Sequence, residues 1–278
     1  MLLPATGYCS CGLAVTILGM RHRELAICLR AYDYSETSQV LHFLTRSGGA
    51  VRALGKGTKR PKSKSGGLVD MFSEGELIYS TGRGESLATL IEYTESDSHS
   101  ALRKDLRRLN AGLYMIEIVA ATVSEADVHV EVFDLLHNAL ARLGQADAPV
   151  QAVLAFFQWR LLGHLGLLGD LRLCQGCQTP LIAAAPAPKG RQEVFFSSTM
   201  GGLICTRCRM TAKEAIAVDA PALAGIAALT ASRSTKRPAL EEPQARKVNR
   251  LLCYHIAQQI NHWPKMARHV VGRVAGSQ

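Results

Sequence analysis

Hydrophobic and polar residues alternate with a period of two in several short stretches of the first third of the chain, which is the pattern of strands with one buried face. In chain order these stretches are 24–34, 38–46, 50–54, 68–79 and 87–93. Glycine-containing turns at 47–49 and 81–84 separate some of them. Five short strands in a span of about 70 residues predict a small barrel or sandwich, and a five-stranded OB-type barrel fits both the number and the span.

From residue 99 onward the hydrophobic spacing changes to steps of three and four, which predicts helices. The first stripe consists of Leu102, Leu106, Leu109, Leu113 and Ile116. The second consists of Val128, Val132, Leu135 and Ala139. Further helices are expected at 150–168, 221–231 and 243–260, and short connections between the first three helices predict an antiparallel bundle. We interpret the aromatic residues Phe156, Phe157 and Trp159 of the third helix as core side chains.

The 278 residues carry 32 Lys+Arg against 23 Asp+Glu, which gives a net charge of +9. This excess suits an anionic partner such as nucleic acid or a membrane surface, but also a basic protein without such a partner. Residues 51–66 hold six of the cations and no acid. We take these six as candidate DNA-binding residues: Arg52, Lys56, Lys59, Arg60, Lys62 and Lys64.

Glycine and proline keep this basic segment out of a helix, so we expect a flexible loop on the barrel. Such a loop can follow a phosphodiester backbone and release its counterions, which favours nucleic acid as the partner. The alternative is a solvated run of charges. A second basic region spans 231–278, where nine Lys+Arg against two Glu leave a net charge of +7.

Four of the eight cysteines form two C-x-x-C pairs, Cys174 with Cys177 and Cys205 with Cys208. Two such knuckles supply four thiolates, which suits tetrahedral Zn²⁺, and a site closed by four sulfurs is structural rather than catalytic. Strands expected at 194–197 and 202–204 lead into the second pair. A pair of redox dithiols is the alternative, but no thioredoxin-like pattern surrounds either motif.

Several function classes find no support in the residues. No metal-hydrolase histidine spacing, phosphate-binding loop or nucleophile elbow is present, and the carboxylates are scattered, so we expect no enzyme. A metal-dependent nuclease and a zinc-ribbon adaptor for RNA or transcription stay open as alternatives. No apolar run reaches the ~18 residues of a membrane helix, so no membrane partner is expected. The cysteine usage favours a reducing, cytoplasmic compartment.

The predicted fold class is therefore α+β with several domains. We expect a disordered N-terminal extension at 1–22, an OB-fold nucleic-acid-binding domain at 23–97 and the first part of an all-α domain at 98–172. An embedded four-cysteine zinc module is expected at 173–210, and the C-terminal helical part with its basic tail at 211–278.

Three segments resemble the RecO family of bacterial DNA repair and recombination mediators. They read A-I-C-L-R-A-Y-D-Y-S-E-T-S at 26–38, G-x-x-R-A-L-G-K-G-T-K-R-P-K-S at 49–63 and F-F-S-S-T-M-G-G-L-I-C-x-x-C at 195–208. The resemblance covers roughly residues 23–270 and is closest to the zinc-containing members. It implies an N-terminal OB fold, a central helical domain and an embedded zinc module.

The resemblance also implies a non-enzymatic role at the bacterial nucleoid. RecO-like proteins bind single- and double-stranded DNA and anneal complementary strands. They act with RecR, and often RecF, to load RecA on DNA coated by single-strand-binding protein, whose acidic C-terminal tail they also contact. The basic segment at 51–66 matches the DNA-binding segment of the family, and the four cysteines match its zinc ligands. For the tail we expect a groove in the helical domain with a flanking arginine.

Overall fold

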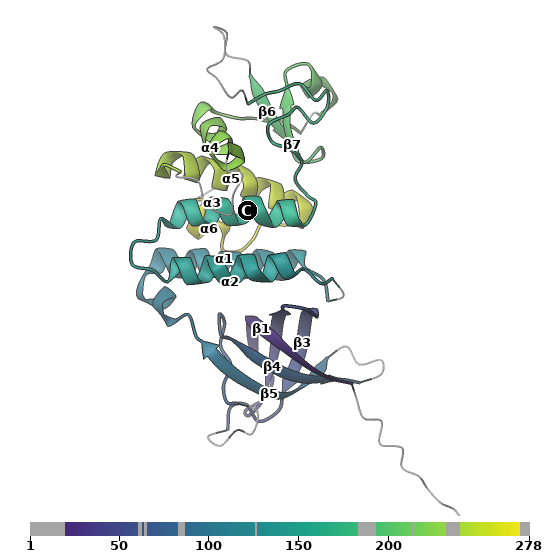
Figure 1. The fold of residues 1–278 in the computed structure, drawn as a ribbon, viewed down its shortest axis with the longest axis vertical. Coiled ribbons are helices and arrows are strands. Elements are labelled where there is room, and N and C mark those ends of the chain that lie inside the picture. The colour runs from purple at the N-terminus through teal and green to yellow at the C-terminus, as the bar shows by residue number, and fades with distance from the viewer. Residues whose placement is uncertain are drawn as a thin grey trace, which may run out of the picture.

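The computed structural model describes residues 20–60, 63, 66–82, 87–125, 127–182, 193–212, 214–231 and 240–272. The described parts form successive layers along the longest axis of the molecule (Figure 1). A barrel lies at one end, a helical body occupies the middle, and a small sheet with the cysteine pairs lies at the other end.

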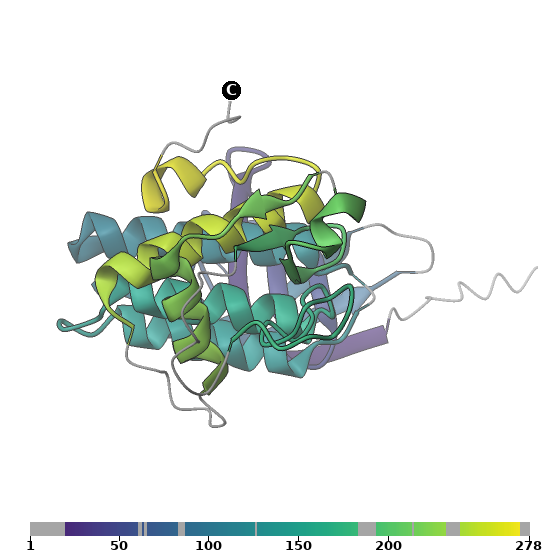
Figure 2. The ribbon, with the colours of Figure 1, turned by 90° about the horizontal axis from the view of Figure 1, so that it is seen from above.

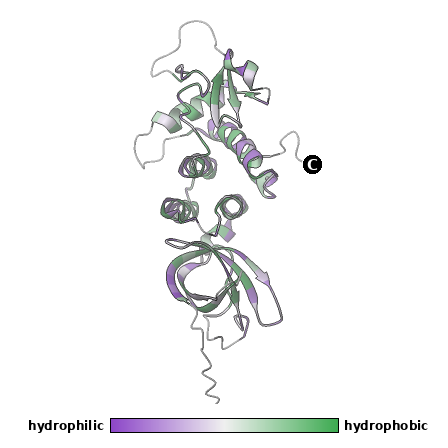
Figure 3. Ribbon diagram, turned by 90° about the vertical axis from the view of Figure 1, so that its right-hand side faces the viewer, coloured by the Kyte–Doolittle hydropathy of each residue, from purple (hydrophilic) through white to green (hydrophobic). Residues whose placement is uncertain are grey.

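The five strands of the first region form a closed barrel in the order β1-β2-β3-β5-β4. Their bounds are β1 Met20–Asp33, β2 Gln39–Thr45, β3 Gly49–Gly55, β4 Glu74–Thr81 and β5 Ala88–Asp97. Neighbouring strands are antiparallel except for the parallel pair β3–β5, which closes the ring seen in Figure 3. The barrel expected from the alternation is thus present.

Two strand boundaries differ from those expected. β1 begins at Met20, so the last three residues of the segment assigned to the extension belong to the barrel, while residues 1–19 lie outside the described part. The strand expected at 68–79 begins only at Glu74. The buried Phe72 just before it has a φ of 72°, in the left-handed region, so the extended backbone cannot start earlier.

Strand β1 is buried on both faces between Ala26 and Leu29. Ala26 and Cys28 point into the barrel, where they pack with Phe43 and other apolar side chains. Ile27 and Leu29 belong instead to the core of the helical body. The continuous apolar run at this point of the sequence is therefore explained by a strand that separates two apolar layers.

The helical body lies on this wall of the barrel, with α1 and α2 next to it and α3, α5 and α6 beyond them (Figures 1 and 3). The bounds are α1 Leu106–Thr122, α2 Val130–Leu143, α3 Val150–His164, α4 Ala220–Ala231, α5 Glu242–Gln259 and α6 Ala267–Val270. Leu106, expected in the first apolar stripe, is 71% exposed. It is the first residue of α1 because the Asp105 carboxylate caps the helix by accepting from the N–H groups of Arg107 and Arg108.

A chain of buried polar side chains connects α1, α3 and α5. Tyr114 Oη donates to Gln158 Oε1 at 2.8 Å, and Gln158 Nε2 donates to Asn249 Oδ1 at 2.8 Å. Asn249 Nδ2 in turn donates to the backbone oxygen of Gln151 at 2.9 Å. Because every member of this chain has a partner, the polar groups fix the relative rotation of three helices without an unpaired buried group.

The small sheet is formed by β6 Val194–Ser197, β7 Gly202–Cys205 and the two-residue β8 Ile216–Ala217. The first two strands were expected, whereas β8 was not. The sheet lies over α5 (Figure 2), where the Phe196 ring packs edge-on against His255 with ring centroids 5.2 Å apart. Gln259 Nε2 also donates to the Ser198 backbone oxygen at 3.3 Å.

The Glu74 carboxylate is a buried polar contact between the barrel and the helical body. His99 Nε2 lies 3.1 Å and His137 Nδ1 lies 2.8 Å from its oxygens, and both rings donate because an ionised carboxylate can only accept. Burial by itself raises the pKa of Glu74, but the hydrogen bonds from His99 and His137 outweigh this effect and hold that pKa below its usual value.

We expect Glu74→Gln to lower the free energy of unfolding by about 1–3 kcal/mol near neutral pH, because both histidines lose a charged acceptor in a buried site. The folded-state pKa of Glu74 lies below the unfolded value. Its stabilisation is therefore fully present above about pH 4.3 and is lost as the pH falls through the folded-state pKa. Urea unfolding of both proteins from neutral to acidic pH measures this difference.

Glu92→Gln is the matched control, because Glu92 is an exposed carboxylate on β5. It should leave the free energy of unfolding nearly unchanged. Two results would contradict the stabilising role of the Glu74 carboxylate. One is that wild type and Glu74→Gln have the same free energy of unfolding at neutral pH. The other is that their difference persists unchanged in acid.

Candidate functional site

The two C-x-x-C pairs meet in one cluster at the end of the molecule farthest from the barrel. The Sγ atoms of Cys174, Cys177, Cys205 and Cys208 all lie within 4.8 Å of one another. The first pair comes from the chain that follows α3, and the second comes from the end of β7 and the 3-10 turn Cys208–Thr211. The hairpin β6–β7 therefore brings together motifs that lie 27 residues apart, from 178 to 204, in the sequence.

The geometry of the cluster fits a tetrahedral metal ion. Sulfurs bound to one ion at about 2.3 Å in a tetrahedron lie about 3.8 Å from each other. The Sγ atoms of Cys177 and Cys205 are 3.8 Å apart. The Cys205 N–H donates to Cys174 Sγ at 3.3 Å, a contact that orients this sulfur as second-layer hydrogen bonds do in metal sites.

The pKa values of the cysteine thiols indicate that the cluster is suited to a cation. Hydrogen bonds, first those of Thr179, lower the pKa of Cys177 to about 6. Burial, followed by hydrogen bonds with the other cysteines, raises the pKa of Cys208 to about 12. Four sulfurs this close cannot all ionise without a cation between them, so the donor set is suited to a bound metal ion.

The basic segment expected to bind DNA divides into residues with different surroundings. Lys62 and Lys64 lie outside the described residues. Arg52 on β3 forms an ion pair with Glu125 in the connection between α1 and α2, and therefore joins the barrel to the helical body. Lys59 Nζ lies 2.9 Å from Asp33 Oδ2 at the end of β1.

Lys56 and Arg60 are exposed, and within the described part of the chain neither has an ion-pair partner. Their loop is fixed to the connection between β1 and β2, because the Lys59 N–H donates to the Thr37 backbone oxygen at 3.1 Å and the Gly57 N–H donates to Ser38 Oγ at 3.4 Å. Sequence position alone could not distinguish Lys56 and Arg60 from the paired cations Arg52 and Lys59. The acidic partners of Arg52 and Lys59 come from other elements of the structure.

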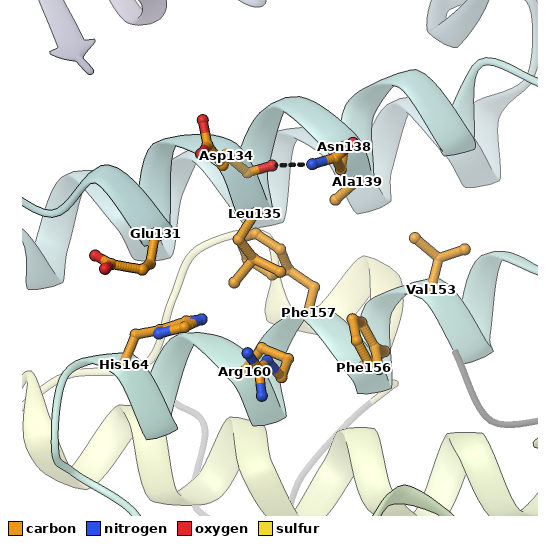
Figure 4. A pocket seen from close by; sticks show the side chains of 10 residues that line it. All are labelled: Glu131, Asp134, Leu135, Asn138, Ala139, Val153, Phe156, Phe157, Arg160 and His164. Carbon is orange, nitrogen blue, oxygen red and sulfur yellow. Dashed lines mark hydrogen bonds between the residues drawn. The ribbon is translucent and has the colours of Figure 1, made fainter. Parts of the chain in front are cut away.

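A groove between α2 and α3, with a volume of about 410 Å³, is the second candidate site (Figure 4). Leu135 and Val153 contribute to its apolar lining, and Arg160 and His164 of α3 lie at one end. Phe156, interpreted above as a core side chain, is only partly buried and lines the groove. The partial exposure of Phe156 was not predicted, because the spacing of apolar residues along a helix does not show which of its sides other elements cover. Phe157 is fully buried, as expected.

A closed five-stranded barrel joined to a helical body that carries a four-cysteine cluster defines a barrel-and-helix protein with a site suited to a metal ion. Residues 20–98 match the family model described as recombination protein O N terminal, and residues 103–269 match that described as recombination protein O C terminal. The chain belongs to the RecO family of DNA repair proteins.

Curated relatives carry the same description. The chain is 32% identical over 183 residues to the DNA repair protein RecO of Moorella thermoacetica, and 30% identical over 187 residues to that of Rhodopirellula baltica. These matches cover 66% of the chain and only 64% and 66% of those two proteins, just under two thirds of their length. The RecO of Myxococcus xanthus is 26% identical over 250 residues, which are 89% of this chain and 98% of that protein. In the described residues, no helix has the length and apolar character needed to cross a membrane.

We expect the double substitution Cys174→Ser with Cys205→Ser to reduce the bound metal from about one ion per chain to near zero, because a site with two sulfurs no longer encloses the ion. The melting temperature should fall as well, since Phe196 of the attached hairpin packs on α5. Elemental analysis of the purified protein and thermal unfolding measure both effects.

The control is Cys253→Ala, which removes a buried thiol of α5 that lies outside the cluster. It should keep the metal content of the wild type. Equal metal content in the wild type and the double variant would refute the site.

Proposed function

We propose that this protein is a non-enzymatic, DNA-binding recombination mediator. It would bind single- and double-stranded DNA, anneal complementary strands and, with RecR, promote RecA loading on DNA coated by single-strand-binding protein, with RecF as a further partner. This role would place it in the bacterial cytoplasm at the nucleoid. The observation that carries the proposal is an exposed basic loop, represented by Lys56 and Arg60, on a closed barrel in a chain of the RecO family.

The mechanism is electrostatic. Cations on the barrel neutralise phosphates and release condensed counterions, which favours binding of any DNA strand. Two strands held on one basic surface repel each other less, and base pairing between them can then proceed without a covalent step. Lys59 can join this surface when a phosphate replaces its partner Asp33, because the carboxylate is exposed and the pair is therefore weak.

The cysteine cluster has a structural role in this proposal. Zn²⁺ is the ion that best suits four thiolates in a tetrahedron, and when bound it supplies the charge that lets all four ionise together. The site has no open position for a substrate. The cysteines hold the β6–β7 hairpin in place, and through Phe196 the hairpin stabilises α5.

The groove between α2 and α3 supports a peptide partner with an acidic stretch and an apolar end. The apolar end would lie against Leu135, Val153 and Phe156, and the acids would lie near Arg160. No ion-pair partner of Arg160 occurs among the described residues, and its guanidinium lies over the Trp159 ring, 5.7 Å from the ring centroid. The C-terminal tail of single-strand-binding protein has this chemistry, and we propose the groove as its site.

Lys56→Gln with Arg60→Gln should weaken the binding of single- and double-stranded oligonucleotides and reduce the salt dependence of the affinity. For single strands the slope of log K against log salt should fall by about 1.4, because two phosphate contacts are lost. Fluorescence anisotropy at several salt concentrations measures this slope.

The matched control is Arg142→Gln with Arg172→Gln, which removes the same two charges from positions paired with Asp147 and Asp170 away from the barrel loop. It should leave the slope unchanged. A slope that is equal in wild type and the Lys56/Arg60 variant would contradict the DNA-binding assignment. Stronger binding to RNA than to single-stranded DNA would instead favour an RNA-binding adaptor.

Arg160→Ala should weaken the binding of a synthetic peptide that has several aspartates before a terminal phenylalanine by about tenfold, because the acids lose a charge-assisted partner. Isothermal titration with this peptide measures the loss. A peptide with asparagines in place of the aspartates should bind wild type and variant equally. Undiminished binding of the acidic peptide to Arg160→Ala would exclude the groove as the tail site.

A further inference from the structure

A β-bulge in β1 changes which side chains reach the outer face of the barrel. Cys28 pairs with Phe43 and Arg30 pairs with His42, so Leu29 is an extra residue without a partner on β2. Ile27 before the bulge and Leu29 within it point outward, and the helical body covers both. A bulge reverses the alternation that follows, because it inserts one residue into a pattern of period two.

After the bulge, the even-numbered residues of β1 face outward. Ala31 packs against the barrel interior, whereas Arg30 and Tyr32 lie on the outer side, and Tyr34 follows at the next even position just beyond the end of β1 at Asp33. Tyr32 is 54% exposed and Tyr34 is 66% exposed, which is unusual for large aromatic residues. Without the bulge, Ala31 and Asp33 would occupy this face and the tyrosines would point into the barrel.

Cross-strand neighbours extend this stripe over the sheet. Arg30 is opposite His42, and His42 is opposite Arg52, so one row of nitrogen-bearing side chains crosses β1, β2 and β3. Tyr32 is opposite Val40, which is opposite Leu54, so the next row presents an aromatic ring beside aliphatic side chains. Arg52 is paired with Glu125, so Arg30 is the cation that the first row leaves without an acidic partner among the described residues, and it lies beside the apolar row.

Basic side chains lie at both ends of this stripe. At one end Arg30 lines a cleft of about 470 Å³ between the barrel and the C-terminal ends of α1 and α5, together with Gln259 and His262. Arg30 donates to Tyr32 Oη at 3.5 Å, and no acidic partner of Arg30 occurs among the described residues. At the other end lies the loop with Lys56 and Arg60, which hydrogen bonds hold against the β1–β2 connection.

We infer that the outer stripe formed by Arg30, Tyr32 and Tyr34 is a stacking platform for the unpaired bases of single-stranded DNA. This inference rests on the proposed DNA-binding function and adds the residues that select single strands. Tyr32 and Tyr34 stack on bases, because every base offers a π-face and a tyrosine ring loses little freedom when it binds. Arg30, Lys56 and Arg60 contact phosphates before and after the stacked bases.

The spacing supports this arrangement. Residues two apart in extended backbone lie about 6.6 Å from each other, and Tyr34 directly follows the last residue of β1, so one extended strand can place bases on both rings. A duplex cannot use the rings, because its bases are already stacked and paired. Of the nearby acids, Asp33 is paired with Lys59 and Glu125 with Arg52, whereas Glu36 is exposed and has no ion pair among the described residues.

The test is Tyr32→Leu with Tyr34→Leu in the full-length chain, titrated by anisotropy against three probes: a labelled oligothymidylate, the same length of abasic backbone and a duplex. The affinity for oligothymidylate should fall by about tenfold or more, because base stacking is lost. The affinities for the abasic strand and the duplex, and the salt slope, should not change. Wild type should prefer oligothymidylate over the abasic strand, and the double variant should lose this preference.

Two controls separate stacking from a general effect. Tyr32→Phe with Tyr34→Phe keeps both rings and should bind oligothymidylate like wild type. Met210→Ser removes an 82% exposed apolar side chain near the cysteine cluster and should change no affinity.

Equal affinity of wild type and the leucine variant for oligothymidylate would overturn the inference while leaving the DNA-binding function intact. An equal loss for the duplex would overturn it as well. Wild type that binds none of the three probes would overturn the proposed function, and the inference with it.

Discussion

Ile27 and Leu29 pass out of the barrel wall into the core of the helical body, while Ala26 and Cys28 on the same strand fill the barrel. The barrel and the helices therefore share one wall, and separating them would expose apolar surface on both sides of it. This constraint determines which face of the barrel stays open. The helices cover β1 at Ile27 and Leu29, whereas Tyr32 beyond the bulge stays exposed, as do Met20 and Leu25 at the start of the strand.

The same core continues to the far end of the molecule. The buried chain from Tyr114 through Gln158 to Asn249 connects the helix beside the barrel with α5. α5 in turn carries the small sheet, whose Val194, Phe196 and Leu203 belong to the core that contains Ile27. The cysteine cluster is thus attached to a continuous apolar interior. A metal ion bound there, as proposed, would keep the hairpin folded so that Phe196 stays in this core.

The features predicted from the sequence are those that depend on local spacing. Period-two alternation identified the strands of the barrel, steps of three and four identified the helices, and two C-x-x-C pairs identified the cluster. The start of α1 at Leu106 was missed although its cap, Asp105, is the preceding residue and a local sequence signal. The fate of Arg52 could not be predicted, because its partner Glu125 lies 73 residues away. The bulge at Leu29 could not be predicted from the sequence, because the continuous apolar run there is compatible with either strand register.

The charge of the protein illustrates why this distinction matters for function. The sequence presents a net charge of +9 and an acid-free segment, but it does not say which cations are already used. Arg46 is bound by both carboxylate oxygens of Asp134 on α2, and Arg52 is bound by Glu125, so these two arginines fasten the barrel to the helices. Lys56 and Arg60, close to them in sequence, remain exposed beyond the junction. Tertiary structure thus sorts similar residues into those that hold the fold together and those that can meet a phosphate, because an ion pair between two elements removes a cation from the surface that a nucleic acid can reach.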